Sequence, residues 1–121
     1  MGSEKIFENK VKSFLNTMNT WYIKYWAGAA GNGKNFTKDG IPDLLACIGG
    51  IFYGIEVKAL NGKPSVLQLV NLRKIREAKG IGILLYPNDF EGFMSFIIGS
   101  NEQWYAENIE LQNQWYDKLT K

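Results

Sequence analysis

The chain has 121 residues, of which 45% are hydrophobic and 21% charged, and it contains one cysteine and no histidine. This length suits a single domain with its own hydrophobic core, so we treat residues 1–121 as one unit. Without histidine, Ser-His-Asp and Cys-His catalytic arrangements are excluded, as is a typical zinc site, and one cysteine excludes an intrachain disulfide. Protein oxygen atoms remain as ligands, and these suit Mg²⁺, Mn²⁺ or Ca²⁺.

The net charge of +2 is unevenly distributed along the chain. Residues 1–80 carry 12 basic and 6 acidic residues, a net +6, whereas residues 81–121 carry 2 basic and 6 acidic residues, a net −4. The first part therefore suits a polyanionic partner. No apolar run approaches the about 18 residues of a membrane span, and the polar start does not resemble a secretory signal. We expect a cytoplasmic protein with no membrane partner.

Hydrophobic periodicity and turn residues predict helices and strands in a definite order. Apolar residues that fall on one side of a helix indicate a helix, and runs of β-branched and aromatic residues indicate strands. Ser65 is expected to cap the second helix. The predicted elements are a helix over 4–18, a strand over 21–26, a glycine-rich loop over 27–40, strands over 43–48 and 51–58, a helix over 66–79, strands over 81–86 and 93–98, and a helix over 101–119. The order α-β-β-β-α-β, followed by a strand and a helix, predicts an α/β fold with a mixed sheet.

The two central strands are separated by Gly49-Gly50, which is typical of a two-residue hairpin turn. With those glycines as the turn, Ile48 faces Ile51, and Asp43 then lies directly opposite Glu56. Opposed residues share one face, with Cβ atoms about 4.5–5.5 Å apart. Two carboxylates in such positions destabilise a sheet unless a cation neutralises them, and a divalent metal ion would do so.

Lys58 lies two residues beyond Glu56 and therefore on the same face. Its ammonium group can orient a water molecule or stabilise a phosphate, and the backbone carbonyl of Val57 can serve as a further metal ligand. The Glu-x-Lys spacing has little specificity by itself, since it also occurs at Glu8/Lys10 and Glu77/Lys79. A simple surface ion pair on an exposed strand is the alternative.

Several short motifs together resemble the PD-(D/E)XK nuclease superfamily and, within it, the VRR-NUC domain in its small stand-alone form from bacteriophages and prophages. The residues that carry the resemblance are Phe7-Glu8-Asn9-Lys10-Val11, Gly40-Ile41-Pro42-Asp43, Gly54-Ile55-Glu56-Val57-Lys58-Ala59, Gly62-Lys63-Pro64-Ser65 with Gln68, and Gly80. The match covers about residues 4–90, an αβββαβ core, and leaves 91–121 as a C-terminal extension. The resemblance implies cleavage of DNA with Mg²⁺ or Mn²⁺, often of branched DNA such as Holliday junctions, by a homodimer.

Two further residues match the family's pattern. Glu8 corresponds to the acid of the first helix, which helps to hold the metal directly or through water. The alternatives are that Glu8 pairs with Lys12 on the helix surface, or that Glu4 is the acid of the first helix. Gln68 corresponds to a glutamine of the second helix that orients the reacting groups. In the alternative, Gln68 forms a capping box with Ser65.

Lysines near the glycine-rich loop are candidates for contact with DNA phosphates. They are Lys24, Lys34 and Lys38, with Lys63 in the turn after the third predicted strand. Charges on solvated loops are the alternative explanation.

The sequence thus leads to the hypothesis of a divalent-metal-dependent DNA endonuclease with Mg²⁺ or Mn²⁺ as cofactor. Its expected metal ligands are Asp43, Glu56, the Val57 carbonyl and Glu8, and its expected catalytic residues are Glu8, Asp43, Glu56, Lys58 and Gln68. One alternative is a catalytically silent DNA-binding or assembly module with the same fold. Another is a small-ligand domain unrelated to nucleic acid, which would show no salt-dependent binding to DNA.

Overall fold

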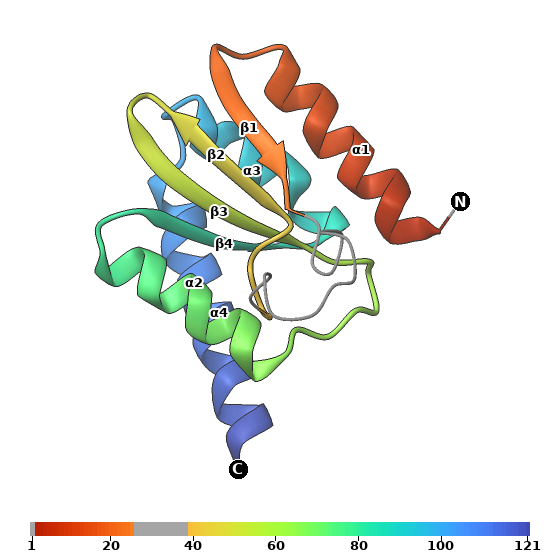
Figure 1. The fold of residues 1–121 in the computed structure, drawn as a ribbon, viewed down its shortest axis with the longest axis vertical. Helices are drawn as coiled ribbons and strands as arrows, with labels where there is room; N and C mark the ends of the chain where they lie inside the picture. The colour runs from red at the N-terminus through yellow and green to blue at the C-terminus, as the bar shows by residue number, and fades with distance from the viewer. Residues whose placement is uncertain (1, 26–38) are drawn as a thin grey trace.

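The computed structural model describes residues 2–25 and 39–121 of the chain. Figure 1 shows the arrangement of the helices and strands. The elements are α1 (Ser3–Asn16), β1 (Thr20–Lys24), β2 (Leu44–Ile48), β3 (Ile51–Val57), α2 (Val66–Glu77), β4 (Ile81–Leu85), the 3₁₀ turn η1 (Pro87–Asp89), α3 (Phe90–Ile97) and α4 (Glu102–Thr120).

The strands form one mixed sheet in the order β1-β2-β3-β4. Strands β1, β2 and β3 are antiparallel neighbours, and β3 and β4 pair in parallel through the crossover helix α2. The expected hairpin register is confirmed, because Ile48 pairs with Ile51. Both turn glycines have positive φ, 61° at Gly49 and 81° at Gly50, as a type I′ turn requires. The predicted order α-β-β-β-α-β and the mixed sheet are therefore confirmed.

Helices cover both faces of the sheet. In Figure 1, α3 lies behind the strands, and α2 lies below β4 and in front of α4. The larger core joins α1 and α3 to one face through residues that include Val11, Ile55 and Phe93, all fully buried. The smaller core joins α2 to the other face through Leu72 and Leu84. The alternation of side chains along β4 thus supplies Ile83 and Leu85 to the larger core and Leu84 to the smaller one.

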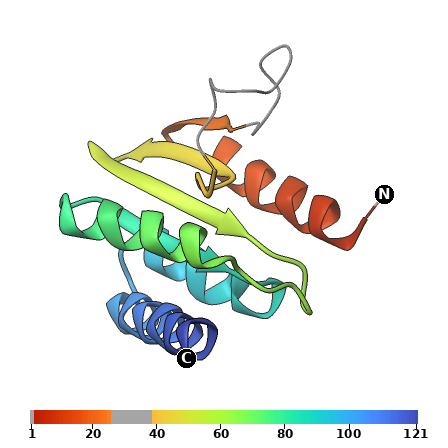
Figure 2. The same ribbon diagram turned by 60° about the horizontal axis from the view of Figure 1, so that its bottom comes forward.

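Helix α4 closes the β4 edge of the sheet. Figure 2 shows α4 on the far side of α2 and α3 from β1. The Asn108 side chain accepts a hydrogen bond from Leu84 N at 3.0 Å and donates one to Leu84 O at 2.7 Å, and Gln112 donates to Gly82 O at 2.8 Å. Because an edge strand leaves backbone donors and acceptors unpaired, these amides replace the strand that would otherwise pair there.

The predicted strand over 93–98 is wrong, since residues 93–97 belong to α3 and Ile98 is its C-cap. Phe90 and Phe93 are buried in the larger core, and Met94 and Ile97 pack against it. These positions follow the i, i+3, i+4, i+7 spacing of a helix, which becomes visible only when Phe90 is included. Pro87 lies at the start of η1, where its fixed φ favours helical backbone. It therefore begins a helical segment after β4. The C-terminal extension therefore consists of helices.

Candidate functional site

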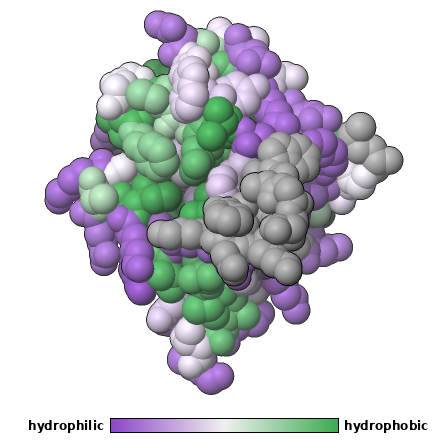
Figure 3. Space-filling view, viewed as in Figure 1, coloured by the Kyte–Doolittle hydropathy of each residue, from purple (hydrophilic) through white to green (hydrophobic). Residues whose placement is uncertain are grey.

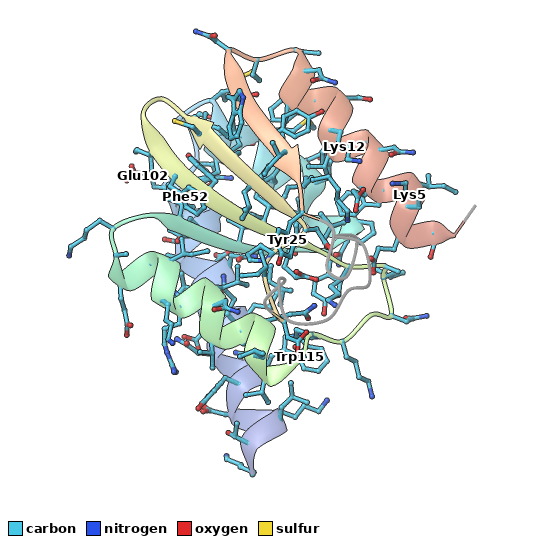
Figure 4. All side chains as sticks on the ribbon, in the orientation of Figure 1. Lys5, Lys12, Tyr25, Phe52, Glu102 and Trp115 are labelled. Atoms are coloured by element: carbon cyan, nitrogen blue, oxygen red, sulfur yellow. The ribbon has the colours of Figure 1, made fainter. Side chains whose placement is uncertain are left out.

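Asp43 and Glu56 meet where β2 begins and β3 ends. The paired register runs from Ile48 opposite Ile51 to Leu44 opposite Ile55, so the next pair outward is Asp43 and Glu56. One Asp43 carboxylate oxygen, Oδ2, accepts a hydrogen bond from Val57 N at 2.9 Å. The Asp43 carbonyl also accepts a hydrogen bond from the backbone N–H of Tyr25, which Figure 4 labels, at 2.8 Å. The Asp43 backbone and side chain are therefore both fixed.

Glu56 and Glu8 are the two buried acidic residues in the described part of the chain. Glu56 is 2% exposed, and among the described residues its Oε1 atom has no hydrogen-bond partner. The other oxygen, Oε2, lies 3.3 Å from the Nζ atom of Lys58. Burial and the nearby Asp43 carboxylate raise the pKa of Glu56 to about 8, although Lys58 acts in the opposite direction. In the metal-free protein at neutral pH, the Glu56 carboxyl therefore keeps its proton, because Lys58 does not offset burial and the Asp43 charge.

The donor set at this position fits a hard divalent cation. It consists of the unpartnered Glu56 Oε1, the Asp43 carboxylate and the backbone of Val57. In a strand, the N–H and C=O of one residue point to the same side, so the Val57 carbonyl points to the side on which its N–H meets Asp43. Mg²⁺ and Mn²⁺ favour carboxylate and carbonyl oxygens, with water or phosphate completing the coordination. Over residues 2–25 and 39–121, no group of three His, Cys, Asp or Glu side chains could hold a metal ion together.

Glu8 lies in a lysine-rich cluster beside this pair. Its carboxylate lies 3.2 Å from Lys5, 3.0 Å from Lys12 and 2.6 Å from Lys24, and it is almost completely buried. Burial acts to raise the pKa of Glu8, but the hydrogen bonds from Lys24 and Lys12 outweigh it and lower the pKa to about 2. Lys5 and Lys12, labelled in Figure 4, lie one helical turn on either side of Glu8. The Glu8–Lys12 pair, which the sequence offers as the alternative role of Glu8, is thus present as one part of a larger network.

Lys24 connects this cluster to Asp43. Its Nζ atom lies 2.6 Å from Glu8 Oε1 and 3.3 Å from Asp43 Oδ1, and its side chain is 17% exposed. Burial acts to lower the pKa of Lys24, but Glu8 and Asp43 overcome that effect and raise it. The structure therefore joins Glu8 to Asp43 through one ammonium group, and Lys24 is largely enclosed by these acids.

The remaining candidates have different surroundings. Gln68 completes the capping box: its Oε1 accepts from Ser65 N at 2.9 Å, and Ser65 Oγ accepts from Gln68 N at 3.1 Å. The Gln68 side chain is therefore engaged at the start of α2. Lys63 is exposed in the segment between β3 and α2. Lys34 and Lys38 lie outside the described residues.

Sequence reasoning missed the role of Lys24 as a bridge. The signal lies in the register of β1, where Lys24 pairs with Leu44, the neighbour of Asp43. That pairing spans a long connection, and the alternation within β1 does not reveal its partner strand.

Comparison with known proteins finds no matching family model, no matching curated protein and no matching solved structure. Within residues 2–25 and 39–121, none of the helices combines the length and the apolar character needed to cross a bilayer.

Proposed function

We propose that the chain is a divalent-metal-dependent deoxyribonuclease, an endonuclease of the VRR-NUC type within the PD-(D/E)XK superfamily. The observation that carries the proposal is the buried Glu56 carboxylate, which faces Asp43 and has one unpartnered oxygen. The αβββαβ order, with Asp43 before one central strand and Glu56-Val57-Lys58 at the end of the next, supports it. The resemblance in sequence motifs supplies the name of the family.

In this proposal Asp43, Glu56 and the Val57 carbonyl hold Mg²⁺ or Mn²⁺. When bound, the ion would lower the pKa of a coordinated water and offset the charge that develops on the phosphate. Lys58, whose ammonium lies 3.3 Å from Glu56, orients the attacking water or contacts the scissile phosphate. Glu8 acts through Lys24, which holds the second Asp43 oxygen in place.

The proposed substrate is DNA, with branched DNA such as a Holliday junction favoured by the family resemblance. The excess of basic residues in the first 80 positions supports a polyanionic partner. Lys63 is the described lysine that we propose for contact with a phosphate outside the metal site. Lys34 and Lys38 keep that proposed role from the sequence.

We also propose that two copies associate through the face of β1, β2 and β3 that carries Trp21, Cys47 and Phe52, which the described residues leave exposed. Trp21, Cys47 and Phe52 lie side by side across these strands. Trp21 is 63% exposed and Phe52 is 48% exposed. Figure 3 shows hydrophobic residues gathered over this part of the sheet. A second copy would cover this apolar surface, giving two sites related by a twofold axis.

Cleavage and metal binding together test the enzymatic proposal. Junction, flap, duplex and single-stranded DNA are each incubated with Mg²⁺ or Mn²⁺, and the products are resolved on a gel. Asp43→Asn and Glu56→Gln are expected to lower the rate at least about 100-fold, because lost charge stabilisation of about 3 kcal/mol corresponds to that factor. Glu77→Gln is the matched control, since it removes the acid of an exposed Glu-x-Lys pair at the C-terminal end of α2. Wild-type cleavage rates in Asp43→Asn would contradict the site.

The silent DNA-binding module remains a second candidate, because the Lys58 and Lys24 ammonium groups already neutralise part of the acidic charge. Calorimetric titration with Mn²⁺ separates the two functions. The nuclease binds Mn²⁺ with a signal that Glu56→Gln abolishes, whereas the silent module binds DNA and shows no carboxylate-dependent heat.

The dimer has its own test in analytical ultracentrifugation. Trp21→Lys is expected to shift a dimer to monomers with little change in thermal stability. Ile98→Lys, at a position that is 62% exposed on another surface, is the control. A monomeric wild-type protein at high micromolar concentration would contradict this surface.

A further inference from the structure

A pocket of about 650 Å³ lies at the carboxyl end of β4. Its apolar wall includes Tyr86, Leu111 and Trp115, and its polar rim includes Asn61 and Lys63. We call it the Trp115 pocket. Its volume falls within the about 300–1,000 Å³ typical of sites for small organic groups.

The pocket begins one strand away from the candidate metal site. Val57 pairs with Leu85 in the parallel register, so Lys58 and Tyr86 are the next neighbours and face the same side. Lys58 N donates a hydrogen bond to Leu85 O at 2.9 Å, which keeps the two chains adjacent beyond the strand ends. Since neighbouring strands lie about 4.8 Å apart, a nucleotide next to one held at Lys58 reaches the pocket.

The wall of the pocket is held in position by a hydrogen bond and by packing. The Tyr86 hydroxyl donates to Gly62 O at 2.7 Å, and Tyr86 and Trp115 belong to the same hydrophobic cluster. Trp115 packs against the smaller core between α2 and the sheet. Figure 4 shows Trp115 beside the start of α2, near the segment that joins β3 to that helix. The aromatic platform is therefore built into the fold at this position.

The chemistry of the lining favours a nucleobase over a phosphate. Trp115 supplies an aromatic ring that lines the pocket, and the Lys118 ammonium lies over that ring, 5.1 Å from its centroid. The amides of Asn61 and Asn88 present both donors and acceptors. Asp89 also lines the pocket, and its negative charge opposes a phosphate inside. Lys63 stands on the rim, where the phosphate attached to a bound base would lie.

We propose that the Trp115 pocket binds an unpaired nucleobase next to the phosphate that is cleaved. The inference rests on the proposed nuclease function and deepens it, because it names the feature of the substrate that the site selects. A paired base must leave its stack at a cost of a few kcal/mol, whereas a base at a flap, gap or junction is already free. The pocket thereby favours branched DNA over fully paired duplex.

The test is a cycle that combines a protein change with a DNA change. Binding is measured by fluorescence anisotropy without divalent ions, so that cleavage does not interfere. The probe is a flap DNA with either a normal or an abasic nucleotide at the unpaired position beside the branch. Trp115→Leu and the abasic nucleotide are each expected to weaken binding about 10-fold, and both together no more than either alone, because they remove the same contact.

Matched variants guard against a folding defect. Trp115→Phe keeps an aromatic ring and is expected to retain most of the affinity. Asn88→Ala changes an exposed amide of the pocket and is expected to weaken flap binding, whereas Asn113→Ala, an exposed amide elsewhere on α4, is expected to leave it unchanged. Thermal unfolding of every variant checks that the chain remains folded.

The outcomes separate this proposal from the function on which it rests. If the two changes multiply, or if Trp115→Leu weakens duplex binding equally, the base pocket is overturned while cleavage of DNA stands. If free deoxyadenosine monophosphate binds as tightly as flap DNA, the pocket takes a free nucleotide and the proposal is also overturned. If the wild-type protein neither binds nor cleaves any DNA, the proposed function itself fails.

Discussion

Removing the Glu56 carboxylate is expected to stabilise the metal-free protein at pH 8. In the folded state, burial and Asp43 raise the pKa of Glu56 from 4.5 to about 8. Between these values the folded protein holds a proton that the unfolded chain has lost, so the free energy of unfolding falls as pH rises. Above pH 8, both states are ionised and the folded state bears the full cost of the buried charge.

The size of this effect follows from the pKa difference. A shift of one unit corresponds to about 1.4 kcal/mol, so the difference between 4.5 and about 8 amounts to about 5 kcal/mol. Over the window from pH 5 to pH 8, the loss is about 4 kcal/mol. That is a large share of the about 5–15 kcal/mol that stabilises an ordinary domain. Glu56→Gln removes the ionisation, and its stability is expected to change much less than that of the wild-type protein over the same window.

Urea unfolding in EDTA at pH values from 5 to 8.5 measures the difference. The chain contains no histidine, so few of its groups titrate in this window. Burial and Glu107 also raise the pKa of Asp89, but Glu56→Gln retains that contribution, and the difference between the two proteins isolates Glu56. Identical pH dependence in the two proteins, or lower stability of Glu56→Gln at pH 8, would refute the reasoning. Added Mn²⁺ is expected to stabilise only the wild-type protein, by about 2.7 kcal/mol at 100 times its Kd.

Two further substitutions test the networks around the site, each by urea unfolding. Lys24→Met is expected to cost about 3 kcal/mol at pH 7 and to raise the pH of acid unfolding. The low pKa of Glu8 stabilises the fold above pH 4.5, and that stability is lost as the pH falls towards 2. Lys5→Met, at a more exposed lysine, is the control, and equal losses of stability in both variants would contradict the central role of Lys24. Asn108→Ala is expected to cost about 2 kcal/mol, since it leaves the edge of β4 unpaired, whereas an unchanged stability, as expected for Asn113→Ala, would contradict the edge-capping role.

The sequence predicts the central hairpin well because its information is local. Two glycines with positive φ fix the turn, and the turn fixes which residue faces which, so the approach of Asp43 to Glu56 follows from counting. The start of α2 is likewise local, because Ser65 and Gln68 lie three positions apart. The αβββαβ order follows from periodicity, since its elements alternate clearly between helical and strand patterns.

The contacts that sequence reasoning missed are between distant segments. Lys24 joins Glu8 and Asp43, which lie 16 and 19 positions away along the chain, and no local rule selects that pairing. Asn108 and Gln112 lie one helical turn apart on α4 and resemble an exposed polar stripe, yet both are buried because β4 needs partners at its edge. Polar residues on a helix can therefore be buried when the helix packs against the edge strand of a sheet and they bond to its backbone.

Asp43 has two roles at the end of the hairpin, a hydrogen bond to the backbone of Val57 and the proposed binding of the metal ion, and substitutions can separate them. Strand β2 begins at Leu44, so no strand residue is left to accept from Val57 N, and the Asp43 side chain takes that place. Asp43→Asn keeps an oxygen that accepts this hydrogen bond, so it is expected to abolish Mn²⁺ binding with little loss of stability. Asp43→Leu loses both functions and leaves the Val57 N–H unpaired, at an additional cost of about 1–3 kcal/mol. Calorimetry and urea unfolding of the two variants measure these effects, and equal stability would show that the carboxylate does not complete the sheet.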